Sequence, residues 1–373
     1  METFGLLHKE NSELAIAAGC AIRDVLKVKE EESVLIVTNP EQNVAAISYS
    51  LYDAVLSAGG CPVLIFQDRK SQLDYAEDAV IEAISSEPDV LLSMSAGKIG
   101  KDRRAELEPY TLNGKDYDHL LTYLLAARKI RGFWSPGVTV EMFSKTVPID
   151  YTELKDRAAR LKAIMDSADT LEITNPHGTD VKVGVSNRKA FTDDGDFSTP
   201  GSGGNLPAGE TFISPALGTT EGIIVFDGSI TLHSGDCIIN DPVRVDVAAG
   251  IIRDIRGADE AKLLLETITM AEENAFSMEE EGRLPPGKGI VYRRNARNIG
   301  EVGIGLNPAV EITGNMLGDE KAFHTCHLAV GSNYDEDAPA LIHLDGLVSK
   351  PTITAIMPDG HRLTFMRGGD LEL

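Results

Sequence analysis

Two patterns of apolar and polar residues alternate along the first half of the chain. Apolar residues recur at helical spacing in residues 12–28 (SELAIAAGCAIRDVLKV), 41–60 and 76–88, and the second of these runs ends at two glycines. Short continuous apolar runs rich in β-forming residues separate them, at SVLIVTN (33–39), CPVLIF (61–66) and DVLLSMS (89–95). Such alternation of helices and buried strands predicts a parallel sheet that is covered on both faces.

The same pattern continues to about residue 168. IRGFWS (130–135) is a further candidate strand, and the charged run YTELKDRAARLKAIMDSA (151–168) is a candidate closing helix. We therefore predict an N-terminal three-layer α/β domain with a parallel sheet over residues 1–168. No GxGxxG and no GxxxxGK[ST] follows any of these strands, so neither common nucleotide-binding motif supports a nucleotide site.

The second half changes character and is rich in short strands. Residues 171–187 (LEITNPHGTDVKVGVSN) are two alternating runs around a PHG turn, which predicts a hairpin. A Gly/Ser-rich stretch follows at 198–210, and 221–238 and 242–257 read as strands separated by turn signals. One helix is predicted within 261–276. The fold class is thus α/β, with a strand-rich α+β C-terminal domain over residues 169–373.

The charge and residue composition of the chain exclude some classes of binding partner. Lys and Arg number 35 against 58 Asp and Glu, a formal net charge of −23, which repels nucleic acid and anionic membranes. No run approaches the roughly 20 apolar residues that span a bilayer. The opening METFGLLHKENSELA lacks an apolar signal core, so we expect a cytoplasmic protein. The four cysteines form no CxxC, which argues against a disulfide framework and a structural Cys-type zinc site.

Candidate chemistry collects near the C-terminus. In LIHLDG, His343 and Asp345 stand two apart, so a strand would point both to one face. An HxD pair of this kind can be a surface salt bridge, a structural hydrogen-bond pair or two ligands of one metal. His327 lies in a second apolar strand, HLAVG, which makes a shared site more plausible. Glu210 and Glu301 each adjoin an apolar strand, where an unpaired carboxylate is costly and metal coordination removes that cost.

Four segments carry a family resemblance when they are taken in order: NLPAGETFISP, GEVGIGLNP, DEKAFHTCHLAVGSNY and IHLDG. They resemble the M29 metallopeptidases of the thermophilic or aminopeptidase T type. The resemblance covers most of the chain, and its specific motifs lie in the last 170 residues or so. It implies a set of five metal ligands, namely Glu210, Glu301, His327, His343 and Asp345.

The resemblance also implies an activity. It predicts a cytoplasmic, homodimeric aminopeptidase acting on peptides through two divalent ions (Zn, Co or Mn) that share an activated water. Tyr334 is the expected catalytic donor to the developing oxyanion. The carboxylate that bridges the ions is best assigned to Glu210 or Asp345. His324 is a possible substrate-binding residue.

Two alternatives stay open. His327, His343 and Asp345 are by themselves the two-histidine, one-carboxylate set of mononuclear iron oxygenases, as in the ring-cleaving 2,5-dihydroxypyridine dioxygenase type, with Fe(II) as cofactor. The short segment between His327 and His343 favours that alternative, whereas the presence of both Glu210 and Glu301 favours the dinuclear hydrolase. The second alternative is a non-catalytic relative that has kept the fold.

Overall fold

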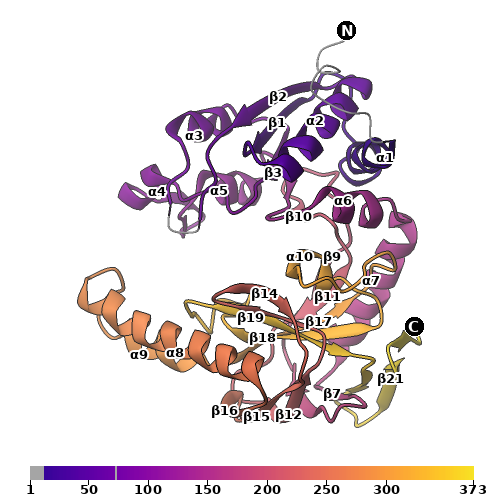
Figure 1. The fold of residues 1–373 in the computed structure, drawn as a ribbon, viewed down its shortest axis with the longest axis vertical. Coiled ribbons are helices and arrows are strands. Elements are labelled where there is room, and N and C mark those ends of the chain that lie inside the picture. The colour runs from indigo at the N-terminus through magenta and orange to yellow at the C-terminus, as the bar shows by residue number, and fades with distance from the viewer. Residues whose placement is uncertain (1–11, 72–73) are drawn as a thin grey trace. The chain divides into compact units, whose positions relative to one another are not determined.

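The computed structural model describes residues 12–71 and 74–373, so most of the opening stretch METFGLLHKENSELA lies outside the described residues. Two compact units divide the chain. Unit 1 contains residues 1–155 and 193–208, and unit 2 contains residues 156–192 and 209–373. The predicted fold class is confirmed: a parallel-sheet N-terminal region is joined to a strand-rich C-terminal region (Figure 1).

Unit 1 is built on a five-stranded sheet in the order β10-β6-β3-β1-β2, and each of its four pairings is parallel. The strands are β1 (Ser33–Thr38), β2 (Cys61–Phe66), β3 (Val90–Met94), β6 (Arg131–Trp134) and β10 (Gly203–Asn205). A small hairpin pairs β4 (Tyr110–Leu112) with β5 (Lys115–Tyr117). The helical elements are α1 (Ser12–Cys20), the π-helix η1 (Ala21–Val25), α2 (Gln42–Ser57), α3 (Asp78–Ser85), α4 (Arg103–Leu107), α5 (Leu120–Ala126) and α6 (Val140–Thr146).

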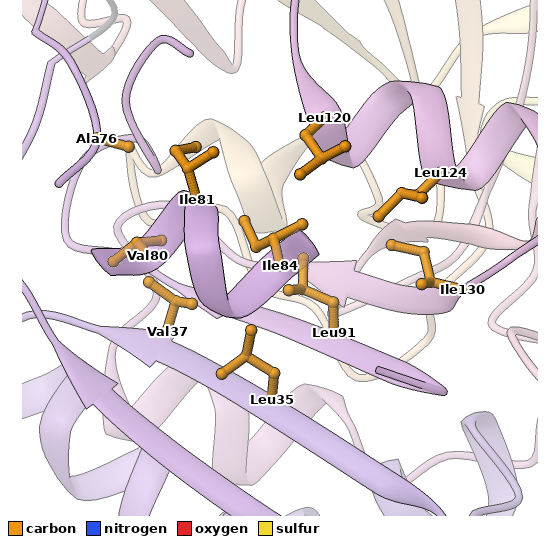
Figure 2. Close-up of a cluster of buried hydrophobic side chains, with 10 residues drawn as sticks. All are labelled: Leu35, Val37, Ala76, Val80, Ile81, Ile84, Leu91, Leu120, Leu124 and Ile130. Atoms are coloured by element: carbon orange, nitrogen blue, oxygen red, sulfur yellow. The ribbon is translucent and has the colours of Figure 1, made fainter. Parts of the chain in front are cut away.

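Helices cover both faces of this sheet, as the continuous apolar strands predict. Helices α1, α2 and α6 pack on one another, and α3 and α5 pack together on the other face. Figure 2 shows the second layer: Leu35 and Leu91 of the sheet point toward Ile84 of α3 and Leu124 of α5. Every residue of β1 after Ser33 is buried, because both of its faces meet helices.

The division of the chain differs from a single boundary near residue 168. Residues 193–208 belong to unit 1, because β10 extends its sheet by pairing with β6. A three-residue strand inside a Gly/Ser-rich stretch has no period-two pattern from which it could be predicted. Helix α7 (Tyr151–Ser167), predicted as the closing helix, itself spans the division between the units at residues 155 and 156.

Unit 2 contains two sheets, and every strand pairing described within them is antiparallel. The seven-stranded sheet has the order β14-β13-β19-β18-β17-β11-β9, and the eight-stranded sheet has the order β16-β15-β12-β8-β7-β20-β21-β22. The first uses β9 (Phe191–Asp193), β11 (Glu210–Ile213), β13 (Ser229–Leu232), β14 (Gly235–Ile238), β17 (Ile299–Gly305), β18 (Thr325–Gly331) and β19 (His343–Ser349). The second uses β7 (Thr170–Thr174), β8 (Asp180–Gly184), β12 (Glu221–Phe226), β15 (Val243–Ala248), β16 (Ile251–Arg256), β20 (Thr352–Ile356), β21 (Arg362–Arg367) and β22 (Asp370–Leu371).

The predicted hairpin is β7 and β8, and the helix predicted within 261–276 is part of α8 (Asp259–Glu280). Helix α9 (Lys288–Asn295) packs on α8, and α10 (Met316–Asp319) is a single turn. One face of the seven-stranded sheet approaches the other sheet closely at Gly346 of β19. A Cβ there would lie 2.5 Å from the ring of Phe226 in β12, so only glycine allows this approach. Residues one step away, such as Asp345, therefore point to the opposite face.

Candidate metal centre

Three of the predicted ligands come from the central strands of the seven-stranded sheet and share one face. In an antiparallel pair, residues directly opposite each other point to the same face, as do residues two apart on one strand. His327 of β18 lies opposite Gly303 of β17 and Leu347 of β19. Glu301 is two residues from Gly303, and Asp345 is two residues from Leu347. The register therefore aims Glu301, His327 and Asp345 at the same side.

The other two predicted ligands, Glu210 and His343, lie on the same face of the sheet, as the strand pairing shows. Glu210 of β11 lies opposite Gly305 of β17, and His343 of β19 lies opposite Gly331 of β18. Gly303, Gly305 and Gly331 therefore lie on this face beside the candidates, and Ala329 lies between Glu301 and Asp345. The clearest case is Gly303, where a Cβ would lie 2.0 Å from Nε2 of His327, so any other residue would displace the imidazole.

The five side chains converge as two groups that share one residue. Glu210, Glu301 and His327 offer ligand atoms within 4.8 Å of one another, and so do Glu301, His343 and Asp345. Nε2 of His327 lies 3.1 Å from Oε1 of Glu301 and 3.5 Å from Oε2 of Glu210. Nε2 of His343 lies 3.4 Å from Oε2 of Glu301 and 3.4 Å from Oδ1 of Asp345.

The shared residue is Glu301, with one carboxylate oxygen facing each group. The prediction assigns the bridging carboxylate to Glu210 or Asp345, and each of these two residues belongs to one group only. The physical reason is position in the sheet. Glu301 is on β17, which pairs with β18, whereas Glu210 and Asp345 come from β11 and β19, the strands on either side of the β17–β18 pair. Nothing in the sequence gives this strand order.

The charges of the site influence one another strongly. Burial disfavours the imidazolium of His327, but the hydrogen bond and charge of Glu301, with Glu210 and Asp345, raise its pKa to about 9. The pKa of His343 is also raised, because Asp345 and Glu301 outweigh its burial. Burial alone would raise the pKa of Asp345, but the two histidines lower it to about 2. Positive charge is therefore favoured between these carboxylates, and a metal ion supplies it.

Buried polar atoms without hydrogen-bond partners indicate whether these residues suit a metal ion. Among the described residues, the buried atoms without a hydrogen-bond partner include Glu210 Oε2, Glu301 Oε2 and Asp345 Oδ1, together with His327 Nδ1. Buried carboxylate oxygens without partners are costly in a folded protein. His343 Nδ1 lies 2.9 Å from the carbonyl oxygen of Ser332, a contact that orients the ring with Nε2 toward the acids. Oxygen and imidazole ligands in this arrangement fit divalent ions, in agreement with the predicted cofactor.

The site also contains a buried lysine, which the sequence motifs did not single out. Lys321 is fully buried, and its Nζ lies 2.5 Å from Oε1 of Glu210 and 2.6 Å from Oε1 of Glu320. Burial raises the pKa of Glu320 to about 8, despite the charge of Lys321. Glu210 thus gives one oxygen to Lys321 and leaves the other facing His327. The only sequence signal was the DEK run before HTCH, which looks like a solvated turn.

Tyr334 lies beside the second group. Its ring packs edge-on to His343 with ring centroids 5.5 Å apart, and it also contacts Phe212, with 4.8 Å between centroids. The side chain is 54% exposed, so it borders the site rather than filling it. Packing around the hydroxyl, and then the charges of Glu301, Glu210 and Asp345, raise the pKa of Tyr334, which keeps the proton on the phenol.

His324 takes no part in either group. Its side chain is more than half exposed, and Nδ1 lies 3.1 Å from Oδ1 of Asp370 and 3.2 Å from the carbonyl oxygen of Gly369. The structure thus places this possible substrate-binding residue against the C-terminal turn. Cys326, one residue before His327, is buried on the other side of β18, and burial raises the pKa of its thiol.

Comparison with known proteins places the chain in a family. The family model described as 2,5-dihydroxypyridine 5,6-dioxygenase matches residues 139–332, just over half of the chain. The chain belongs to the 2,5-dihydroxypyridine 5,6-dioxygenase family. That match contains Glu210, Glu301 and His327 and ends before Tyr334, His343 and Asp345. Among curated protein sequences, none matches the chain.

Two solved structures share the fold along nearly the whole chain. The 2,5-dihydroxypyridine dioxygenase of Pseudomonas putida KT2440 matches with a TM-score of 0.69 and 16% identity, over 97% of this chain and 98% of that one. Wild-type AmpT from Thermus thermophilus matches with a TM-score of 0.66 and 17% identity, over 97% and 99%. At these identities the likeness shows the fold alone. The family match and the shared fold together indicate an enzyme, as predicted. Separately, no described helix has the length and apolar content to cross a membrane.

Proposed function

We propose that this protein is a metal-dependent aminopeptidase that releases N-terminal residues from peptides. One observation carries the proposal: the five candidate ligands, four of them buried and His343 half-buried, form two groups joined through Glu301, which is an arrangement for two ions rather than one. The fold shared with AmpT agrees with the resemblance of the sequence motifs to the aminopeptidase T type.

The residues divide the work between the two groups. Glu210 and His327 would hold a metal in one group, and His343 and Asp345 would hold a metal in the other, with Glu301 belonging to both groups. Divalent ions, once bound, would supply Lewis acidity, which would lower the pKa of water and polarise a peptide carbonyl. A free substrate amine is attracted to this side of the sheet because three carboxylates converge there.

Tyr334 and Lys321 shape the rest of the reaction. The phenol of Tyr334 keeps its proton and borders the group that contains His343, so it can donate a hydrogen bond to the oxyanion that develops. The ammonium of Lys321 holds Glu210 by one oxygen, which leaves a single oxygen for a metal. Lys321 therefore positions a ligand and reduces the negative charge of its group.

The experiment that tests this function is metal analysis of the purified chain combined with a screen of aminoacyl substrates. Two ions per chain and hydrolysis of an aminoacyl bond, both lost on chelation and restored by Zn, Co or Mn, are the expected results. A matched control is Glu172→Gln, which removes a carboxylate of β7 that pairs with Lys182 and leaves the ligand set intact. One ion per chain, or two ions without hydrolysis of any aminoacyl substrate, would contradict the proposal.

A second candidate is a mononuclear Fe(II) ring-cleaving dioxygenase, which the family match favours. Its expected ligand set is His327, His343 and Asp345, but among the described residues these three do not form a group of their own, because the two histidines stand in different groups. Oxygen consumption with a dihydroxypyridine, by protein that carries one iron per chain, would establish this candidate. Absence of both metal and activity would leave a non-catalytic relative.

We further propose that the enzyme is a cytoplasmic homodimer, from the family resemblance and from the abundance of two-fold dimers among soluble oligomers. Light scattering coupled to size exclusion measures the mass of the particle directly. With a chain of 40.1 kDa, a particle of that mass at all concentrations would rule out the dimer.

A further inference from the structure

Unit 1 contains a cavity of about 470 Å³ that the proposed reaction does not use. It lies where the parallel strands β3 and β6 end, and residues after both strands line it, including Ser95 and Pro136. The carboxyl ends of parallel strands are where ligands of open α/β sheets bind. The volume falls within the roughly 300–1,000 Å³ that is typical of small-molecule sites.

The wall of the cavity is largely apolar because α5 is apolar on two faces. Leu120 and Leu124 point into the buried cluster of Figure 2. Leu121 and Leu125, one step further round the helix, line the cavity and stay half-buried. Trp134, at the end of β6, adds its ring and is also half-buried. Apolar side chains left partly open around a hollow favour an apolar ligand.

The loop of residues 97–102, which lines the cavity, is fixed in place. The backbone N–H of Lys98 donates to the carbonyl oxygen of Lys70 over 2.8 Å, and a Cβ on Gly97 would lie 2.3 Å from that same oxygen. Asp102 caps α4 and accepts a hydrogen bond from the N–H of Leu120, which ties the loop to the start of α5. The cavity is therefore preformed, so a ligand need not order a loop.

Two charges of opposite sign remain available on the lining. The side chains of Lys98 and Asp118 are exposed, and neither forms an ion pair or a hydrogen bond with any residue that the structure describes. The other charges have partners: Lys101 pairs with Glu106, and Asp102 is occupied by the caps described above. The lining thus offers one cation and one anion beside an apolar wall.

We propose that this cavity binds an apolar α-amino acid or a short apolar peptide in its zwitterionic form. Lys98 takes the carboxylate, Asp118 takes the ammonium group, and Leu121, Leu125 and Trp134 contact the apolar side chain. The proposal stands on the cavity alone and does not depend on the aminopeptidase assignment.

Trp134 provides the measurement, because it is the chain's one tryptophan and it lines the cavity. Tryptophan fluorescence of the full chain is titrated with L-leucine and with three analogues that each lack one of its groups. Leucinamide lacks the carboxylate, 4-methylpentanoate lacks the ammonium group, and glycine lacks the side chain. Leucine is expected to change the emission saturably, and the other three to bind at least about tenfold more weakly. Leucyl-leucine in place of leucine distinguishes a peptide from a free amino acid as the ligand.

Variants separate the two charges. Lys98→Ala is expected to weaken leucine about tenfold and to leave leucinamide unchanged, with recovery in Lys98→Arg. Asp118→Asn is expected to weaken leucine and to leave 4-methylpentanoate unchanged. Lys29→Ala removes an exposed lysine elsewhere in unit 1 and serves as the control.

The same titration with Asp345→Asn separates this cavity from the metal centre. Unchanged leucine affinity in that variant is expected, whatever becomes of its peptidase activity. No saturable change with leucine or leucyl-leucine, equal affinity for all four small ligands, or equal effects of Lys98→Ala and Lys29→Ala would each overturn the proposal.

Discussion

Each unit buries charged side chains, but the two units differ in whether the buried polar atoms have hydrogen-bond partners. In unit 1, Arg131 donates to both oxygens of Glu32, at 3.1 and 2.6 Å, and its Nε donates to the carbonyl oxygen of Leu26. In unit 2, Glu210, Glu301 and Asp345 each keep a buried oxygen without a hydrogen-bond partner among the described residues. The first arrangement is complete by itself and stabilises a fold, whereas the second is incomplete and marks a site.

This contrast has a consequence for mutation. Removing one partner from the complete pair leaves a buried charge, so stability falls while chemistry elsewhere is untouched. Removing one member of the incomplete set takes away a ligand and also relieves repulsion between carboxylates, so activity falls more than stability. Four predictions test this division.

The largest effect is expected at Glu301, which serves both ligand groups. Glu301→Gln should lower the metal content of both groups and reduce kcat/KM by roughly 10³-fold or more, since outer-shell changes alone cost about 10–100-fold. Metal analysis and peptidase kinetics measure it, and Glu32→Gln in unit 1 is the matched control. A variant that keeps two ions per chain would remove Glu301 from the bridging position.

Arg131→Met should act on stability alone. It leaves the carboxylate of Glu32 without its guanidinium partner in a place where that carboxylate is 17% exposed, so we expect the unfolding free energy to fall by about 3 kcal/mol. Denaturant unfolding gives the value, and metal content should match that of the unmodified chain. If the variant loses metal in its folded state, the two kinds of buried charge are not independent.

Tyr334→Phe should slow the reaction and leave the protein otherwise intact. The phenol is half-exposed, so its removal barely affects stability, but the loss of one donor to a developing oxyanion costs roughly 10²–10³-fold in kcat. Metal content should stay the same. An unaltered kcat would make the tyrosine a packing residue for His343 and Phe212.

The smallest effect is the pH dependence of unit 1. Burial raises the pKa of Glu32, but its bonds to Arg131 and to the N–H of Lys29 outweigh burial, so the folded pKa lies below the ordinary value of 4.5. A lowered folded pKa means that the pair stabilises the protein above pH 4.5, and that this contribution disappears as the pH falls through the folded pKa.

The chain should therefore lose about 1 kcal/mol more on acidification than Glu32→Gln does, since partly exposed pairs contribute roughly that much. Denaturant unfolding of both proteins at neutral and acid pH measures the difference. Parallel pH profiles for the two proteins would show that the pair contributes nothing that titrates.

Much of this protein could be predicted from the order of its residues. The alternation of apolar runs predicted the parallel sheet with helices on both faces, because strands buried on two sides are apolar at most positions instead of at every second one. HLD on β19 gave two ligands on one face, because side chains on a strand alternate with a period of two. Glu210, Glu301 and His327 stood out for a related reason, since polar groups beside apolar strands need a partner.

What only the tertiary structure decided depends on pairings between distant parts of the chain. Glu301 faces both ligand groups because β17 lies between β11 and β18, and the order of strands in a sheet is not contained in any single strand. Lys321 enters the site because the short α10 turn brings a run of charged residues against Glu210, which is 111 positions earlier in the chain. Residues 203–205 join unit 1 because β6 offers an open edge. Local periodicity determines which face a side chain takes, but long-range packing determines what that side chain meets there.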